Sequence, residues 1–200
     1  MDSRKDRIGK LSTTAIDAMW YELQAEPLFW KGKAEELKRS ALVLAEVFFE
    51  DCEALRRHLG EHQEMGHSSV PVNHSSTLDQ FVLLAAFALE NILKGYVIFK
   101  EPNLVANGKL EGILRSHALL ALAERAGVDL TPEENRFCVL ASSAAVSWGR
   151  YPITDSSNKT IAGTTVHSRS VAVFESLFDR LNAEFGERFH GRAERPRKAT

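Results

Sequence analysis

The stretch that decides the fold is residues 76–100, STLDQFVLLAAFALENILKGYVIFK. Within it, residues 81–89 are all apolar. A helix that is apolar on nearly all sides is buried on nearly all sides, so we expect this one to be the central helix of a bundle. Ser76 and Asp79 have the spacing of a capping box, with Asp in place of Glu, and predict that the helix begins close to Leu78.

Two charged residues interrupt this apolar stretch. Glu90 and Lys94 are four residues apart and share one face of the predicted helix. Two interpretations stay open: an ion pair on a partly exposed stripe, or a buried pair at the centre of the bundle that holds Arg150 or His117 in place. Burial of unpaired charge is costly, so the second interpretation needs a charged partner, and Arg150 is the one that we expect.

Length and composition are those of one ordinary globular domain. The chain has 200 residues, of which 44% are apolar and 26% charged. A net charge of −2 argues against a nucleic-acid binder that uses its whole surface, although it allows a local basic patch. The charged N-terminus lacks the apolar segment of a signal peptide, and the apolar run is about half of the ~20 residues of a membrane span, so we expect a cytoplasmic protein with no membrane contact. Cys52 and Cys138 lie on apolar faces of predicted helices and are expected to be reduced, buried thiols.

Apolar residues at helical spacing predict two helices before the central one. The first is short, begins at Thr13 or Thr14 and ends at Pro27. The second spans residues 33–59 and ends at Gly60, and we expect residues 28–30 to pack under the bundle before it. The apolar positions are Ile16, Met19, Trp20 and Leu23 in the first helix, and Leu37, Ala41, Leu44, Phe48, Cys52, Leu55 and Leu59 in the second.

Three further helices are expected after the central one. Ser116 predicts the N-cap of a short helix over residues 117–126, which Gly127 ends. Residues 131–134, Thr-Pro-Glu-Glu, predict a capped helix that Gly149 ends. A polar loop over residues 150–166 precedes the last helix, which starts near position 168 or 170. Its inward side is Phe174, Leu177, Phe178, Leu181 and Phe185.

We find no credible pair of strands in the sequence. The fold class predicted is therefore all-α, an up-and-down antiparallel bundle of five to six helices. Residues 1–190 are expected to form a single domain, and residues 191–200 a disordered basic tail.

Three passages, in this order, resemble the HEPN superfamily of helical-bundle domains: AFALENILKGYVIFK (86–100), SHALLALAERAG (116–127) and WGRYPI (148–153). The superfamily commonly shows an acidic residue followed by lysine in a long apolar helix, matched by Glu90 and Lys94. It often shows a histidine at the start of a short leucine-rich helix, matched by His117, and a Trp-x-Arg-Tyr-Pro run matches residues 148–152. The resemblance implies a helical bundle, often a dimer, with roles that include RNA cleavage in toxin–antitoxin or antiphage defence systems and non-catalytic functions linked to RNA or nucleotides.

Catalytic members of the superfamily carry an arginine followed by a polar residue, with four to six residues in all between that arginine and a histidine. In this sequence the spacing is met by Arg57 with His62 and by the overlapping Arg56 with His62. Both pairs lie before the central helix, whereas the family places the motif after it. At the family's position, residues 150–152 are followed by no histidine before His167. The catalytic motif is therefore expected to be absent or displaced.

The candidate site residues follow from these matches. If the protein acts on RNA, we expect His117 to be the general base at a ribose 2′-hydroxyl and Arg150 to clamp the phosphate. Glu90 and Lys94 would organise these two, and Tyr151 would offer a stacking surface. Simpler interpretations stay open: a solvent-exposed His117 in the first helical turn, an Arg150 that binds helix-end carbonyls, and a Tyr151 packed under the loop.

Three functions stay open at this stage. The first is a HEPN-like, nucleic-acid-associated or toxin/defence-type module with doubtful catalysis. The second is a metal-independent endoribonuclease that uses Arg57 and His62 across a dimer interface. The third is a non-enzymatic protein-interaction module whose contact surface is the loop over residues 150–166. Expected partners are RNA, a nucleotidyltransferase-type antitoxin and a second copy of the chain; neither a metal site nor a cofactor is predicted.

Overall fold

The computed structural model describes residues 13–64, 77–106, 108–150 and 168–193. Within these ranges the chain forms six α-helices and two short 3-10 helices, so the expected all-α bundle is confirmed. The α-helices are α1 (Thr13–Gln24), α2 (Pro27–Glu64), α3 (Leu78–Lys100), α4 (Leu119–Ala126), α5 (Pro132–Val146) and α6 (Ser168–Ala193).

Helix α3 lies at the centre of the bundle, as its apolar sequence predicts. Helices α2, α4, α5 and α6 all pack against it, and α3 is buried along most of its length. By length and composition α3 is also the one helix of the described chain that would suffice to cross a membrane, and most of its apolar window is covered by the rest of the protein. The apolar side chains of α3 therefore form the core.

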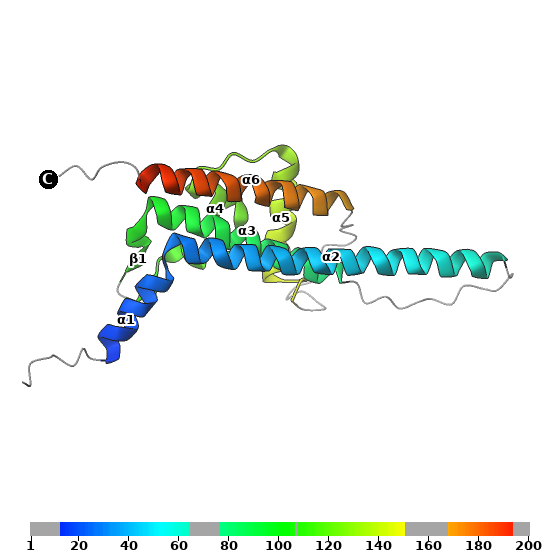
Figure 1. Ribbon diagram of the computed structural model, residues 1–200, viewed down its shortest axis with the longest axis horizontal. Coiled ribbons are helices and arrows are strands. Elements are labelled where there is room, and N and C mark those ends of the chain that lie inside the picture. Colours follow the sequence, from blue (N-terminus) through cyan, green and yellow to red (C-terminus); the bar gives the residue numbers. More distant parts are fainter. Residues whose placement is uncertain (1–12, 65–76, 107, 151–167, 194–200) are drawn as a thin grey trace, which may run out of the picture.

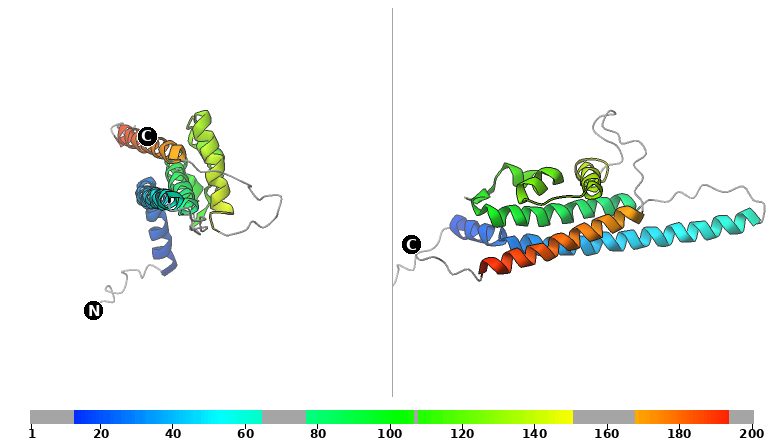
Figure 2. Two further views of the ribbon diagram at one scale, coloured as in Figure 1. Left: turned by 90° about the vertical axis from the view of Figure 1, so that its right-hand side faces the viewer. Right: turned by 90° about the horizontal axis from the view of Figure 1, so that it is seen from above.

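The long helices lie side by side around α3. Both α3 and α6 run back along α2 (Figure 1). Seen from above, α4 and α5 lie on one side of α3 while α2 and α6 lie on the other, and α5 crosses the direction of the long helices (Figure 2). The inward side predicted for α6 is confirmed, because all five of its predicted apolar residues are buried.

Helix α2 is longer at both ends than the sequence predicts. It begins at Pro27, which suits a first helical position because proline has no N–H to leave unpaired. The expectation that residues 28–30 pack under the bundle is wrong for two of them: Leu28 and Phe29 are 51% and 55% exposed. Gly60 does not end the helix, since one glycine inside a long helix costs only ~1 kcal/mol. The C-terminal part of α2, cyan in Figure 1, extends beyond the other helices.

Helix α3 begins without the predicted capping box. Thr77 occupies the N-cap position, with helical backbone angles and no side-chain cap, and Ser76 lies outside the described residues. The Thr77 hydroxyl donates instead to the carbonyl of Leu44 on α2, at 3.2 Å. The start of the central helix is therefore tied to its neighbour rather than capped locally.

Between α3 and α4 the structure contains a two-stranded ladder that the sequence analysis missed. Strands β1 (Val105–Ala106) and β2 (Lys109–Leu110) pair antiparallel. Gly108 between them has φ +67°, a left-handed conformation that glycine adopts without strain. The Asn107-Gly108 pair is a strong sequence signal for such a hairpin.

Helices α4 and α6 differ at one end from their predictions. Helix α4 begins at Leu119, two residues later than predicted, so His117 lies in an extended connector and not in a first helical turn. Gly127 ends α4 in the left-handed conformation, as predicted. Helix α6 continues to Ala193, so the tail predicted to be disordered from residue 191 is helical at its start; residues 194–200 lie outside the description.

Candidate active site on the central helix

Glu90 and Lys94 form a buried ion pair on α3. The ammonium of Lys94 lies 2.6 Å from Glu90 Oε1, and the two side chains are only 6% and 8% exposed. A lone buried charge is costly, so each side chain requires the other. Of the two interpretations that the sequence left open, the structure therefore contains the buried pair.

His117 is the second partner of Glu90. Its Nδ1 lies 2.7 Å from Glu90 Oε2, and its side chain is 35% exposed. A carboxylate only accepts hydrogen bonds, so Nδ1 carries the proton and donates, which in a neutral imidazole leaves the lone pair on Nε2. The expectation that Arg150 is the charged partner of Glu90 is wrong, because the histidine of the connector occupies that place.

The connector before α4 is held by two hydroxyl groups. Ser116 Oγ accepts from the backbone N–H of Ala118, and Ser142 Oγ of α5 accepts from the N–H of Leu119, both at 3.0 Å. The side chain of Leu119 is buried in the core. His117 is thus fixed between a local turn and an anchored first helical residue, and its ring turns toward α3.

Arg150 reaches the same part of α3 from the turn that follows α5. Its guanidinium carbon lies 5.2 Å from the centre of the Phe87 ring, within the range of a cation–π contact. The centre of the His117 ring lies 6.2 Å from the centre of the same ring. Phe87 precedes Glu90 by one helical turn, so Arg150 and His117 meet around one aromatic side chain on one face of α3.

The turn before Arg150 requires a glycine. The Gly149 N–H donates to the carbonyl of Ala144, and a Cβ at position 149 would lie 2.8 Å from that oxygen and 3.1 Å from Leu83 Cβ. No larger residue fits there without displacing backbone. The close packing of this turn on α3 places Arg150, which is itself exposed, beside Phe87.

Trp30 supports the network from α2. Lys94 Nζ lies 6.0 Å from the centre of the Trp30 ring, and Trp30 Nε1 donates to the carbonyl of Ala25. Four segments of the chain therefore converge here: the start of α2, the middle of α3, the connector before α4 and the turn after α5. We refer to Glu90, Lys94, His117 and Arg150 as the α3 site.

The sequence analysis missed Phe87 and Trp30 as parts of this site. The spacing of three residues between Phe87 and Glu90 was the available signal, because it places both on one helical face. Trp30 gave no such signal, since its place beside Lys94 depends on how α2 packs against α3. Both contacts bind cationic groups to aromatic faces.

The alternative catalytic pair lies on another part of the molecule. Arg57 is an exposed residue of α2, and none of the contacts described for the α3 site involves it. His62 belongs to the same helix, which corrects our placement of it after the helix end, and its side chain lies outside the description. Tyr151 and the loop over residues 151–166 also lie outside the described residues, so these predictions stay open.

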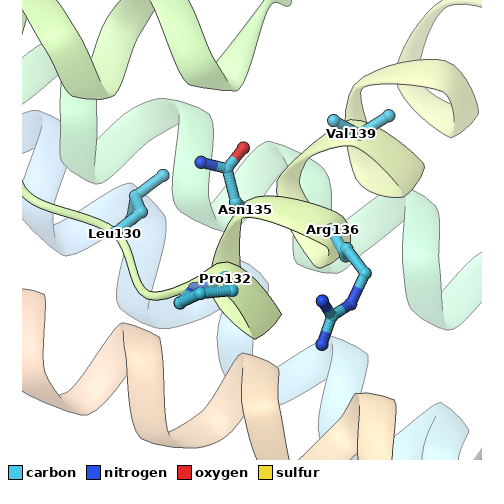
Figure 3. Close-up of a pocket in the computed structure, with 5 residues that line it drawn as sticks. All are labelled: Leu130, Pro132, Asn135, Arg136 and Val139. Carbon is cyan, nitrogen blue, oxygen red and sulfur yellow. The ribbon is translucent and has the colours of Figure 1, made fainter.

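A separate shallow pocket lies at the start of α5. It is lined by Leu130, Pro132, Asn135, Arg136 and Val139, and none of these belongs to the α3 site (Figure 3). The sticks in Figure 3 come from α5 and the residues just before it, and Arg136 points away from Asn135. The lining combines apolar side chains with one amide and one guanidinium, and it contains no group that serves as a general base.

The described part of the chain contains no group of three His, Cys, Asp or Glu side chains placed to hold a metal ion. Comparisons of the chain with family models, with curated proteins and with solved structures gave no match. Function is therefore inferred from the residues of the α3 site and from their geometry.

Proposed function

We propose that this chain is a HEPN-like helical bundle that binds RNA at the α3 site. One observation carries the proposal. A buried carboxylate, Glu90, holds Nδ1 of a partly exposed histidine, while a guanidinium packs on the aromatic ring that the histidine also contacts. A structural ion pair alone requires neither a partly exposed imidazole nor an exposed arginine beside it.

The chemistry of these groups suits a ribose-phosphate backbone. A guanidinium offers a planar fork of donors that binds phosphate oxygens in pairs, and an imidazole nitrogen accepts a hydrogen bond from a 2′-hydroxyl. Glu90 is already neutralised by Lys94, so its charge does not oppose an incoming phosphate. The net charge of −2 fits a local site rather than a basic surface.

RNA cleavage is the second candidate function, and the hydrogen bond between Glu90 and His117 favours it. A carboxylate that orients Nδ1–H leaves Nε2 free to take the proton of a 2′-hydroxyl. The 2′-oxygen then bonds to the adjacent phosphorus, the bond to the 5′-oxygen breaks, and that oxygen takes a proton from water. The products are a 2′,3′-cyclic phosphate and a 5′-hydroxyl, and Arg150 neutralises charge on the phosphate without a metal ion.

Binding of a fluorescent single-stranded RNA, measured by anisotropy in the presence of EDTA, tests the first candidate function. We expect Arg150→Ala to weaken binding by about tenfold and to lower the salt dependence by about one phosphate contact. Arg136→Ala is the matched control, because it removes an exposed arginine from α5 outside the site. Equal effects of the two substitutions would contradict binding at the α3 site.

Cleavage of a mixed RNA pool, again in the presence of EDTA, tests the second candidate function, RNA cleavage. We expect any cleavage to be lost in His117→Ala and to persist in His62→Ala. The reverse result would favour Arg57 and His62 on α2. A defence role, a nucleotidyltransferase-type partner and a cytoplasmic location remain predictions from the sequence and its resemblance.

A further inference from the structure

Helix α1 turns its apolar side to solvent. The helix projects away from the bundle at the start of α2 (Figure 1). Its four large apolar residues follow the spacing of a single helical face, which in an amphipathic helix normally packs against the core. All four are between 37% and 54% exposed: Ile16, Met19, Trp20 and Leu23. We call these four residues the α1 face.

The side chains that lie across the helix from the α1 face are the more buried ones. At about 100° per residue, Tyr21 and Ala25 lie opposite that face. Tyr21 is half-buried, and Ala25, just after the helix, is buried. The next large apolar residues along the chain, Leu28 and Phe29 of α2, are also exposed. The orientation of α1 therefore leaves its apolar side uncovered by the described chain.

Carboxylates flank the α1 face on both sides. Asp17 lies about 60° around the helix from the nearest residue of the face on one side, and Glu22 lies about 60° from it on the other. Both acidic residues are exposed. Residues 13–30 contain no lysine, arginine or histidine, and the next two lysines along the chain, Lys31 and Lys33, each pair with a glutamate of α2. The α1 face is therefore an apolar stripe with an acidic border.

We propose that the α1 face binds a partner protein through an amphipathic helix whose apolar stripe is bordered by lysine or arginine. When two helices pair along their apolar stripes, the residues that border the two stripes face one another, and their charges decide which partner is accepted. Asp17 and Glu22 at these positions select a basic border. Trp20 and Met19 are of the types enriched at the centres of protein interfaces, where tryptophan often contributes much of the binding energy.

The same charges argue against three other occupants. The acidic border repels an anionic lipid surface and the phosphate backbone of RNA. A second copy of the chain would place the carboxylates of one α1 opposite those of the other in either helix direction, because each border carries one. A basic helix turns the same carboxylates into attractive partners.

The proposal does not depend on RNA binding. The α1 face contains no residue of the α3 site, and its evidence is the exposure and the charge of α1. The two places are linked only through Trp30, which donates to the carbonyl of Ala25 and lies over Lys94. Its test is the binding of a peptide, so its failure would leave the proposed RNA binding as it stands.

Binding of two fluorescein-labelled synthetic peptides to the full-length chain, measured by anisotropy, tests the proposal. Both peptides are helical and carry the same leucine stripe, which is bordered by lysine in one and by glutamate in the other. We expect the lysine peptide to bind at least about tenfold more tightly, and the difference to shrink as salt is added. Met19→Ser/Leu23→Ser should weaken its binding at least about tenfold. The matched control, Val139→Ser/Val146→Ser, alters two similarly exposed apolar residues of α5 and should bind like the wild type.

Reversal of the border charges gives a second test. Asp17→Lys/Glu22→Lys should bind the glutamate peptide more tightly than the lysine peptide, because the border then has the opposite sign. The control, Glu50→Lys/Glu53→Lys, makes the same change of net charge at two exposed residues of α2 and should keep the preference of the wild type. Circular dichroism should show the same helix content in every variant.

Four results would overturn the proposal. They are no binding of the lysine peptide at its highest soluble concentration, equal binding of the two peptides, an equal loss in the α1 and α5 variants, and a preference that reverses equally in both charge variants.

The other occupants have readouts of their own. A wild-type dimer in light scattering that Met19→Ser/Leu23→Ser dissociates would assign the α1 face to a second copy. Sedimentation with phosphatidylserine vesicles that the same variant abolishes would assign it to a membrane. Weaker binding of single-stranded RNA in that variant would assign it to RNA. Each of these three results would also overturn the proposal.

Discussion

At the residue scale, the buried carboxylate of Glu90 requires hydrogen-bonding or charged partners around it. Each of its two oxygens has a cationic or hydrogen-bonding partner, Lys94 at 2.6 Å and His117 at 2.7 Å. Burial makes both contacts costly to lose, because water cannot replace a missing partner at a side chain that is 8% exposed. The pair therefore serves stability and the site at the same time.

We predict that Lys94→Met lowers the free energy of unfolding by about 3–5 kcal/mol, because it leaves Glu90 buried with one partner. Chemical denaturation followed by circular dichroism measures the change. The double variant Glu90→Leu/Lys94→Met should recover most of the loss, since no charge then remains buried. A double variant as unstable as the two single variants added together would show that the two side chains do not form a coupled pair.

The sequence predicted the contact between Glu90 and Lys94, but it left open whether that pair holds His117 or Arg150. The spacing of four residues predicts the contact within α3. The contact with His117 depends on the extended connector before α4 and on Ser142, a residue of another helix that binds its end. Arg150 seemed the natural partner from charge alone, whereas packing of the Gly149 turn places it over Phe87.

At the element scale, α5 has the most complete local signal, and the structure confirms it. Thr131 Oγ1 accepts from the Glu134 N–H, and Glu134 Oε2 accepts from the Thr131 N–H. Glu134 also binds Arg180 of α6 at 3.0 Å. Burial raises the pKa of Glu134, but the hydrogen bonds from Thr131 and Arg180 outweigh it, so the pKa is held below its usual value.

We predict that Glu134→Gln lowers the free energy of unfolding by about 1–2 kcal/mol at neutral pH and leaves it unchanged in strong acid. A carboxylate with a lowered pKa in the folded state stabilises the fold above the ordinary value of 4.5, and the contribution disappears as the pH falls through the lowered pKa. Unfolding midpoints across this pH range measure the effect. Glu133→Gln is the control, because the partners of Glu133 are exposed arginines, and it should cost less than about 1 kcal/mol. A pH-independent cost would mean that the charge of Glu134 contributes nothing.

Helix ends that depend on tertiary packing were the ones that the sequence predicted least well. The capping box of α5 and Gly127 after α4 involve neighbouring residues only, and both predictions hold. The predicted capping box at the start of α3 does not hold, because the Thr77 hydroxyl donates to a carbonyl of α2 instead. The spacing in α1 predicts the helix, but it does not predict that the apolar residues of this helix lie exposed.

At the scale of the whole molecule, the central helix brings distant segments together. Residues 30, 87–94, 117 and 150 meet only because α2, the connector before α4 and the turn after α5 all pack on α3. The apolar stretch predicted this centre, and the buried residues of the other helices surround it. Spacing within α3 predicts only the contacts among its own residues, and the contacts with residues 30, 117 and 150 depend on how the other segments pack.

The two cysteines report on this packing. Cys138 is buried against the core, and burial, helped by the nearby charge of Glu134, raises the pKa of its thiol to about 12. Cys52 is only partly buried, which corrects the expectation that both are buried. We predict that a thiol reagent labels Cys52 of the native protein at least tenfold faster than Cys138, and labels both at once in denaturant. Equal rates in the native state would contradict the packing of α5 on α3.

The most direct test of the proposed site is the nitrogen NMR spectrum of the histidine rings, with the His117 signals identified by their loss in His117→Gln. In the neutral ring, we predict a proton on Nδ1 of His117, which donates to Glu90, and a lone pair on Nε2. Addition of single-stranded RNA should then shift the Nε2 signal of His117. A proton on Nε2, or a signal that stays unchanged at saturating RNA, would contradict the account.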